Sequence, residues 1–308
     1  MRGRNAVEKT LMQNLKQSVI QNITPELRRW IVEQAEAGCR PEDVIAAMRA
    51  SGWEEAVAEA AMEHTLRQRL AEQGLGSTLS DPPGTAAMSP SRVPEPALEG
   101  APTLLNVGGH EMRVLLTLRH PRLVLFGGFM SDDECTELMA LAAPRLLRSE
   151  TVDNNTGGSE VNAARTSDGM FFERGEHPLI QRIEDRIAAL LRWPLTHGEG
   201  LQILRYRPGA EYRPHHDYFD PALPGAPRIL KRGGQRVGTL VMYLNTPQGG
   251  GATVFPDAGL DVTPVRGNAV FFSYDRPHPS TRTLHGGAPV TAGEKWVATK
   301  WMREGVFV

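Results

Sequence analysis

The pattern of apolar and polar residues changes twice along the chain and predicts three segments. In residues 1–74, apolar side chains recur at helical spacing. Pro25 and Pro41 each stand where a helix can begin, and residues 53–72 predict a third helix that is rich in alanine and charge. We therefore expect a small all-α module at this end of the chain.

The three predicted helices share two tryptophans, Trp30 and Trp53, which can form the centre of a small bundle. This arrangement resembles three-helix domains of the ubiquitin-associated type, which implies that the module binds a protein. A structural or docking appendage is the alternative. We favour the appendage, because no residue pattern in the segment indicates catalysis.

Residues 75–103 contain six prolines and show no apolar period. Proline has no amide hydrogen to contribute to a helix or a sheet, so this composition predicts a flexible, partly extended linker. The linker would separate the helical module from a larger domain over residues 104–308.

Residues 104–308 combine two predicted helices with many short apolar runs. A capping box at residues 131–134 and a proline at position 178 mark the starts of the helices. The apolar runs are rich in branched residues, which favour strands. These runs are Val114–Leu118, Leu123–Phe126, Leu201–Tyr206, Gly238–Leu244, Ala269–Tyr274 and Lys295–Met302. Helices followed by successive strands predict an α+β domain built on a β-sandwich or jelly roll.

Composition and charge narrow the possible partners. The 308 residues are 40% hydrophobic, and the formal net charge of −2 provides no basic field for nucleic acid. No apolar stretch reaches the roughly 18 residues of a membrane span, so we expect no membrane partner. Cys39 and Cys135 form neither a CxxC motif nor a disulfide framework, which favours a cytoplasmic protein.

His215 and Asp217 are the first candidates for chemistry. On an extended chain, side chains two residues apart project to the same face, so an imidazole and a carboxylate converge. The pair suits a divalent iron ion if a second histidine completes a facial triad. An isolated His-x-Asp pair is also typical of a surface hydrogen bond, so this pair alone does not decide between the two.

The downstream sequence favours the metal site, because four motifs follow one another in a set order. They are Tyr206-x-x-Gly209-x-x-Tyr212-x-x-His215-x-Asp217, Arg236-x-x-Thr239-x-x-x-Tyr243-Leu244, the Gly-Gly-x-Thr-x-Phe-Pro run ending at Pro256, and His285 with Lys295 and Trp301. Together they resemble the Fe(II)/2-oxoglutarate dioxygenases, and within them the prolyl 4-hydroxylase group. The resemblance covers roughly residues 104–308. It implies a double-stranded β-helix, or jelly roll, with supporting helices.

The resemblance also implies a metal site and a co-substrate site. Iron would be bound by His215, Asp217 and His285. His278 competes as third ligand, but it lies in a loop-like Arg-Pro-His-Pro stretch, whereas His285 has the expected offset to Lys295. Lys295 would meet the distal carboxylate of 2-oxoglutarate, because a buried carboxylate needs a fixed cation.

Further side chains are assigned by their place in the motifs. Those expected to line the 2-oxoglutarate pocket are Tyr206, Thr253, Thr299 and Trp301. Those expected near a peptide substrate are Arg236, Tyr212 and Arg165. For the pocket residues the alternative is a role as core side chains, and for Arg236 it is a surface charge on a loop.

The implied activity is a hydroxylase that uses Fe2+, 2-oxoglutarate and O2, with ascorbate as a further cofactor. It would decarboxylate 2-oxoglutarate to succinate and hydroxylate a proline in a peptide or protein, as prolyl 4-hydroxylases do. One alternative is the same chemistry on a small molecule or another side chain. The other is a non-catalytic binding protein that retains the barrel, against which the intact His/Asp/His/Lys set argues.

Overall fold

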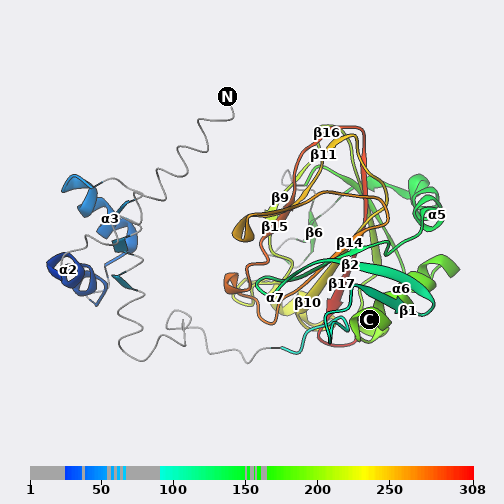
Figure 1. Cartoon of the computed structure of the whole chain (residues 1–308), viewed down its shortest axis with the longest axis horizontal. Coiled ribbons are helices and arrows are strands. Elements are labelled where there is room, and N and C mark those ends of the chain that lie inside the picture. The colour runs from blue at the N-terminus through cyan, green and yellow to red at the C-terminus, as the bar shows by residue number, and fades with distance from the viewer. Residues whose placement is uncertain are drawn as a thin grey trace. The chain divides into compact units, whose positions relative to one another are not determined.

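The computed structural model divides the chain into two compact units, Met1–Ala87 and Met88–Val308, and each is considered by itself (Figure 1). The described residues are 25–36, 39–53, 57–58, 61–62, 65–66, 91–149, 151–152, 156, 158–160 and 165–308. Among them, no helix has the length and apolar character that crossing a bilayer requires.

The N-terminal unit contains two of the predicted helices, α2 (Pro25–Glu36) and α3 (Pro41–Ala50). They meet at a small apolar cluster that includes Ile31 and Met48, both almost fully buried. The proline at the first position of α3 fits there because the first amide groups of a helix have no partner within it.

Trp30 and Trp53 both pack against this cluster and are partly buried, so they share one core. The predicted helix over residues 53–72 lies mostly outside the described residues. Its described positions are helical, and they are residues 57–58, 61–62 and 65–66.

The C-terminal unit is built on two antiparallel sheets that form a jelly roll. The larger sheet contains, in spatial order, β1 (Leu104–Val107), β2 (His110–Leu118), β3 (Arg122–Gly127), β14 (Ala269–Ser273), β10 (Arg236–Tyr243), β17 (Lys295–Arg303), β8 (Leu201–Tyr206), β7 (Asp168–Phe172) and β4 (Leu147–Arg148). The smaller sheet contains β13 (Leu260–Val262), β12 (Thr253–Phe255), β15 (His285–Gly287) and β9 (Tyr212–His215). Two short strand pairs complete the set, β11 (Gly249–Gly250) with β16 (Val290–Ala292) and β5 (Thr151–Val152) with β6 (Ser159–Glu160). The α+β class and the jelly roll predicted from the sequence are thereby confirmed.

The larger sheet carries different elements on its two faces. Helices α5 (Asp132–Ala142) and α6 (Pro178–Leu191) cover one face, and β9 and β15 of the smaller sheet lie on the other side (Figure 1). A separate apolar core fills each side. Leu138 of α5 belongs to the first core, and Phe255 of the smaller sheet belongs to the second.

Local sequence explains where these helices begin. The capping box of α5 is confirmed, because Ser131 Oγ accepts from the Glu134 amide at 3.1 Å while the Glu134 carboxylate accepts from the Ser131 amide at 3.1 Å. Pro178 stands in the first turn of α6. A shorter helix, α7 (Ala226–Leu230), lies in the connection between β9 and β10.

The boundary of the predicted linker differs from the expectation. Residues 91–103 were expected to be flexible, but the described chain from Ser91 onward lies on the jelly-roll domain. Pro94 and Pro96 are buried, and the Glu95 amide donates to the Leu191 carbonyl at 3.0 Å. Prolines suit such a docked segment, because it lies outside both sheets and makes few backbone hydrogen bonds, and the fixed φ of proline reduces the entropy lost on ordering.

We predict that a chain starting at Met88 folds with full stability, whereas one starting at Leu104 is destabilised. Removing the docked segment exposes the apolar surface under Val93 and Leu98, both of which pack on the core. The free energy of unfolding should fall by on the order of 2–4 kcal/mol, as expected for the loss of one or two buried side chains. Urea unfolding of both chains measures this difference. Equal stability would mean that the segment does not hold the domain together.

Candidate active site

A cavity between the two sheets gathers most of the side chains singled out in the sequence. One wall comes from β8, β10 and β17 of the larger sheet, and the other from β9, β12 and β15 of the smaller one. Ten of the eleven residues assigned to a site above line this cavity, and the exception is Arg236.

Three possible metal ligands meet in this cavity. The ligand atoms of His215, Asp217 and His285 all lie within 4.8 Å of one another. His215 Nε2 is 3.6 Å from Asp217 Oδ1, and His285 Nε2 is 3.4 Å from Asp217 Oδ2. Two imidazoles and a carboxylate in this arrangement suit a divalent iron ion. Within the described part of the chain, this is the one group of three such ligands.

Strand pairing places the two histidines, since His215 of β9 lies opposite His285 of β15. The strands approach closely beside them. A side chain at Gly286 would put its Cβ 2.8 Å from the Tyr212 carbonyl oxygen, so only glycine fits there. Asp217 is placed differently from the expectation of one shared strand face, because β9 ends at His215 and Asp217 follows in a bend.

Each histidine has one ring nitrogen occupied by backbone. The Nδ1 of His215 is 2.9 Å from the Arg213 carbonyl oxygen, and the Nδ1 of His285 is 3.0 Å from the Thr283 carbonyl oxygen. A carbonyl only accepts, so each Nδ1 carries the proton and each Nε2 keeps its lone pair. Metal-binding histidines are commonly oriented by this kind of bond. The donor set therefore fits an iron ion in chemistry as well as in distance.

Protonation states support the same conclusion. Burial raises the pKa of Asp217, but the neighbouring His285, His215 and Arg236 outweigh that effect and hold the pKa well below its usual range. Burial lowers the pKa of His285 to about 4. At neutral pH the cavity therefore offers an ionised carboxylate and a neutral imidazole, which are the forms that bind metals.

Lys295 lies in the same cavity and is only 4% exposed. Its Nζ stands 5.6 Å from the Tyr206 ring centre and 5.8 Å from the Tyr243 ring centre. Burial lowers the pKa of Lys295 to about 8, and no ion pair links it to an acidic residue in the described part of the chain. A buried ammonium group without a carboxylate is costly, which makes this position suited to an anionic ligand.

The other predicted pocket residues surround Lys295 and the metal ligands. Thr299 and Trp301 share the strand face of Lys295 on β17, and Tyr206 is its neighbour across the β8–β17 pair. Thr253 accepts a hydrogen bond from the Tyr243 hydroxyl at 2.8 Å.

The three residues assigned to a peptide substrate separate into two groups. Arg165 and Tyr212 line the cavity, where Tyr212 stacks on His215 with ring centres 3.7 Å apart. Arg236 does not line it. Its Nε and Nη2 atoms bind the Glu199 carboxylate at 2.6 and 2.9 Å, so the assignment of Arg236 to the substrate is not supported by its position.

Several side chains beside the cavity were not assigned from the sequence. Thr239 and Tyr243 do stand in one of the quoted motifs, and strand alternation along β10 could have placed them on the cavity side. Glu199, Gln202 and Tyr274 carried no motif or spacing signal. Only the fold brings these three residues next to the site.

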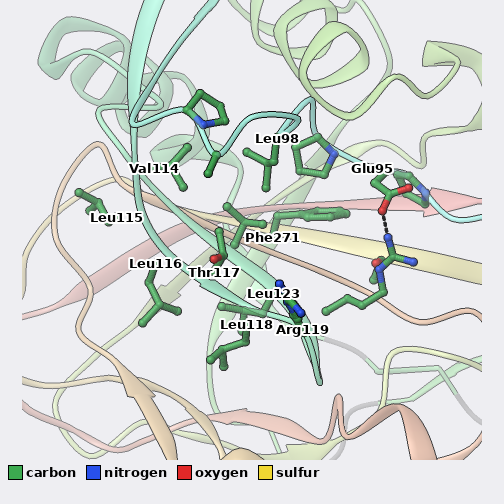
Figure 2. A pocket seen from close by; sticks show the side chains of 17 residues that line it. Glu95, Leu98, Val114, Leu115, Leu116, Thr117, Leu118, Arg119, Leu123 and Phe271 are labelled. Carbon is green, nitrogen blue, oxygen red and sulfur yellow. Dashed lines mark ion pairs between the residues drawn. The ribbon is translucent and has the colours of Figure 1, made fainter.

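A second cavity is larger but carries no comparable chemistry. It measures about 720 Å³, against about 50 Å³ for the site, and lies between residues 94–102 and strands β2, β3 and β14. Figure 2 shows mainly apolar side chains in it, such as Leu98, Val114 and Phe271. Glu95 and Arg122, which both line it, form an ion pair. We therefore place the active site between the sheets.

Comparison with known proteins agrees with this placement. The family model of the 2OG-Fe(II) oxygenase superfamily matches residues 201–303, which contain all three candidate metal ligands and Lys295. Prolyl 4-hydroxylase 1 of Arabidopsis thaliana is 44% identical over 218 residues, which span 65% of this chain and 75% of the relative. The chain belongs to the 2OG-Fe(II) oxygenase superfamily.

Other similar proteins carry related names. Probable prolyl 4-hydroxylase 3 of Arabidopsis thaliana is 40% identical over 208 residues, with 61% of this chain and 71% of the relative covered. Among solved structures, the viral collagen prolyl hydroxylase of Paramecium Bursaria Chlorella virus-1 in its 2OG complex is 30% identical. That match covers 59% of this chain and 95% of the viral chain, with a TM-score of 0.46.

The resemblance to the prolyl 4-hydroxylase group found in the sequence is confirmed. This oxygenase is a 2-oxoglutarate-dependent dioxygenase, and its family implies Fe2+, 2-oxoglutarate and O2 as the reacting partners. The donor atoms of His215, Asp217 and His285 are consistent with the iron.

We predict that His285→Ala lowers the affinity for Co2+, an air-stable substitute for Fe2+, by roughly 100-fold or more. This exceeds the loss expected when a group that merely supports a ligand is removed. Calorimetric titration of the apo-protein measures it. His278→Ala is the matched control and should bind Co2+ normally, because His278 caps a short helical turn and accepts from the Ser280 amide. The reverse outcome would show that the third ligand is His278.

Proposed function

We propose that this oxygenase hydroxylates a prolyl residue in a peptide or protein and decarboxylates 2-oxoglutarate to succinate. One observation carries the proposal. A His/Asp/His set and a buried lysine with no acidic partner among the described residues line the same cavity. The relatives named prolyl 4-hydroxylase support proline as the substrate residue.

In this proposal His215, Asp217 and His285 hold the iron. Bound iron, 2-oxoglutarate and O2 supply an oxidant that converts C–H to C–OH, while the second oxygen atom enters succinate and carbon dioxide leaves. The chain itself binds and orients the reactants and keeps water away. The apolar side chains of Leu204, Val241 and Val297 in the cavity wall suit that last task.

Lys295 is proposed to bind the distal carboxylate of 2-oxoglutarate. Thr253 can add a second bond: its oxygen already accepts from Tyr243, so its own hydroxyl proton is free to be donated to the same carboxylate. Tyr206, Thr299 and Trp301 are proposed to complete the walls of this pocket, since all three line the cavity with Lys295.

The substrate side of the cavity is proposed to include Arg165 and Tyr212. Arg165 is held in place because its Nη2 donates to Gln202 Oε1 at 2.8 Å. The Trp301 indole nitrogen is buried without a hydrogen-bond partner, although Trp301 lines the cavity. We propose that this unpaired donor binds a carbonyl or carboxylate oxygen of a reactant.

Three finer assignments belong to the same proposal. Ascorbate would serve as a reductant that keeps the iron in the Fe2+ state. A cytoplasmic location fits a chain with two free cysteines, Cys39 exposed and Cys135 buried. The N-terminal helical module, expected over residues 1–74, would act as a docking appendage that binds a protein.

We predict that the affinity for 2-oxoglutarate falls as the pH rises through about 8. Burial lowers the pKa of Lys295 to about 8. Above that pH the free protein must take up a proton before the ammonium group can attract the carboxylate. Linkage then weakens binding by up to about tenfold per pH unit. Lys295→Ala should lose roughly 10- to 150-fold in affinity at pH 7, the worth of a charge-assisted hydrogen bond.

Lys295→Arg is the matched control for this prediction. A guanidinium stays charged throughout, so this variant should bind more weakly than the wild type but without the pH dependence. Titration of the metal-loaded wild type, Lys295→Ala and Lys295→Arg with 2-oxoglutarate between pH 7 and about 9.5 measures the three affinities. If Lys295→Ala binds 2-oxoglutarate like the wild type, the lysine has no role in the pocket.

The proposed activity is tested by incubating the protein with Fe2+, 2-oxoglutarate, ascorbate and proline-rich peptides. We expect succinate and peptide carrying one added oxygen per proline modified, and neither with Asp217→Ala. Fragment-ion mass spectrometry locates the oxygen. Succinate formation without oxygen on any proline, in peptides or in cell extract, would point to another substrate. No turnover of 2-oxoglutarate at all would indicate a binding protein.

A further inference from the structure

Asp217 is bound by a chain of two buried hydroxyl groups. Thr239 Oγ1 lies 2.7 Å from Asp217 Oδ2 and 2.9 Å from the Tyr274 hydroxyl oxygen. Thr239 is 1% exposed, Tyr274 is 2% exposed and Asp217 is 6% exposed. Solvent therefore has little access to these groups, and the hydrogen bonds between them take its place.

The direction of the chain follows from the chemistry of its members. An ionised carboxylate can only accept, so the Thr239 hydroxyl must donate to Asp217. The Thr239 oxygen is then free to accept, and the Tyr274 hydroxyl donates to it. Burial raises the pKa of Tyr274 well above its usual range, which keeps this donor protonated.

Thr239 and Tyr274 contact Asp217 at a position where no strand pairing holds its backbone. β9 ends at His215, so no strand pairing fixes the backbone of Asp217. Thr239 lies within β10, opposite Trp301 of β17, and Tyr274 directly follows β14. β10 and β14 pair with each other, and the Tyr274 amide donates to the Val237 carbonyl of β10 at 3.1 Å, so the larger sheet holds both residues in place.

We infer that Thr239 and Tyr274 are positioning residues that occupy Asp217 Oδ2, so that Asp217 ligates the metal through Oδ1 alone. This inference rests on the proposed function. A carboxylate that chelates with both oxygens takes two coordination positions. The co-substrate and O2 need the positions that the triad leaves open. Holding one oxygen in a hydrogen bond keeps those positions available.

The inference is tested on the full chain, freed of metal and titrated with Co2+. Thr239→Val keeps the side-chain shape but removes the hydroxyl, and should weaken Co2+ binding by about 10- to 100-fold. Thr239→Ser restores the hydroxyl and should return the affinity to within about threefold of the wild type. Tyr274→Phe should weaken binding less than Thr239→Val, because Thr239 can still donate. Urea unfolding of each apo-protein reports whether the fold is intact.

A second readout separates positioning from packing. The visible absorption of bound Co2+ weakens as its coordination number rises, so Thr239→Val should show weaker bands per bound ion than the wild type. Thr281→Val is the matched control: it removes another buried threonine hydroxyl, which binds the His278 carbonyl and Thr283 rather than Asp217. That variant should keep the wild-type affinity and spectrum.

The possible outcomes separate this inference from the proposed function. A wild-type protein that does not bind Co2+ would overturn the metal site itself. Wild-type affinity and spectrum in a folded Thr239→Val protein would overturn only the positioning role, as would a Thr239→Ser protein that behaves like Thr239→Val. If Thr239→Val does not fold, Tyr274→Phe decides: reduced Co2+ affinity supports the role, and unchanged affinity overturns it.

Discussion

Asp217 must stay ionised although water hardly reaches it, and much of the site is arranged around that requirement. A carboxylate in apolar surroundings takes up a proton unless partners stabilise its charge. Here Thr239 donates a hydrogen bond to Asp217, and the positive charge of Arg236 favours its ionised form. Lys295 is the complementary case, a buried cation whose partner is not supplied by the described chain. The cavity thus holds the negative charge of Asp217, which neighbouring protein groups stabilise, and the positive charge of Lys295, which is left for a ligand.

A sheet with a core on both faces makes this arrangement possible. Strand β17 directs Trp296 and Ala298 towards the helices, while Lys295, Val297 and Thr299 face the smaller sheet. The helix side contributes apolar packing that anchors the strand. The opposite side can therefore present polar groups at fixed positions, because their backbone is already held by hydrogen bonds on both edges.

A second buried carboxylate supports the cavity wall. Glu199 binds Arg236 at 2.6 Å and Arg303 at 2.7 Å, and it is itself buried. Arg236 in turn lies over the Trp301 ring at 4.0 Å. The arginine that the motif suggested for substrate binding thus fixes an aromatic side chain of the cavity. Such an interaction depends on a carboxylate far away in sequence, and no local pattern indicates it.

The sequence by itself determined the α+β class, six of the nine strands of the larger sheet, both covering helices and the motifs that identify the family. These features rest on local propensity, on apolar patterns and on fixed spacings within one strand or turn. Tertiary structure decided the rest. It docked residues 91–103 on the domain, turned Arg236 towards Glu199 and brought Tyr274 and Thr239 to Asp217. Each of these depends on contacts between segments distant in sequence, whose partners are chosen by how the two sheets and their connections pack. The sequence could therefore indicate which side chains carry the chemistry, but only the packed fold shows which groups hold them in place.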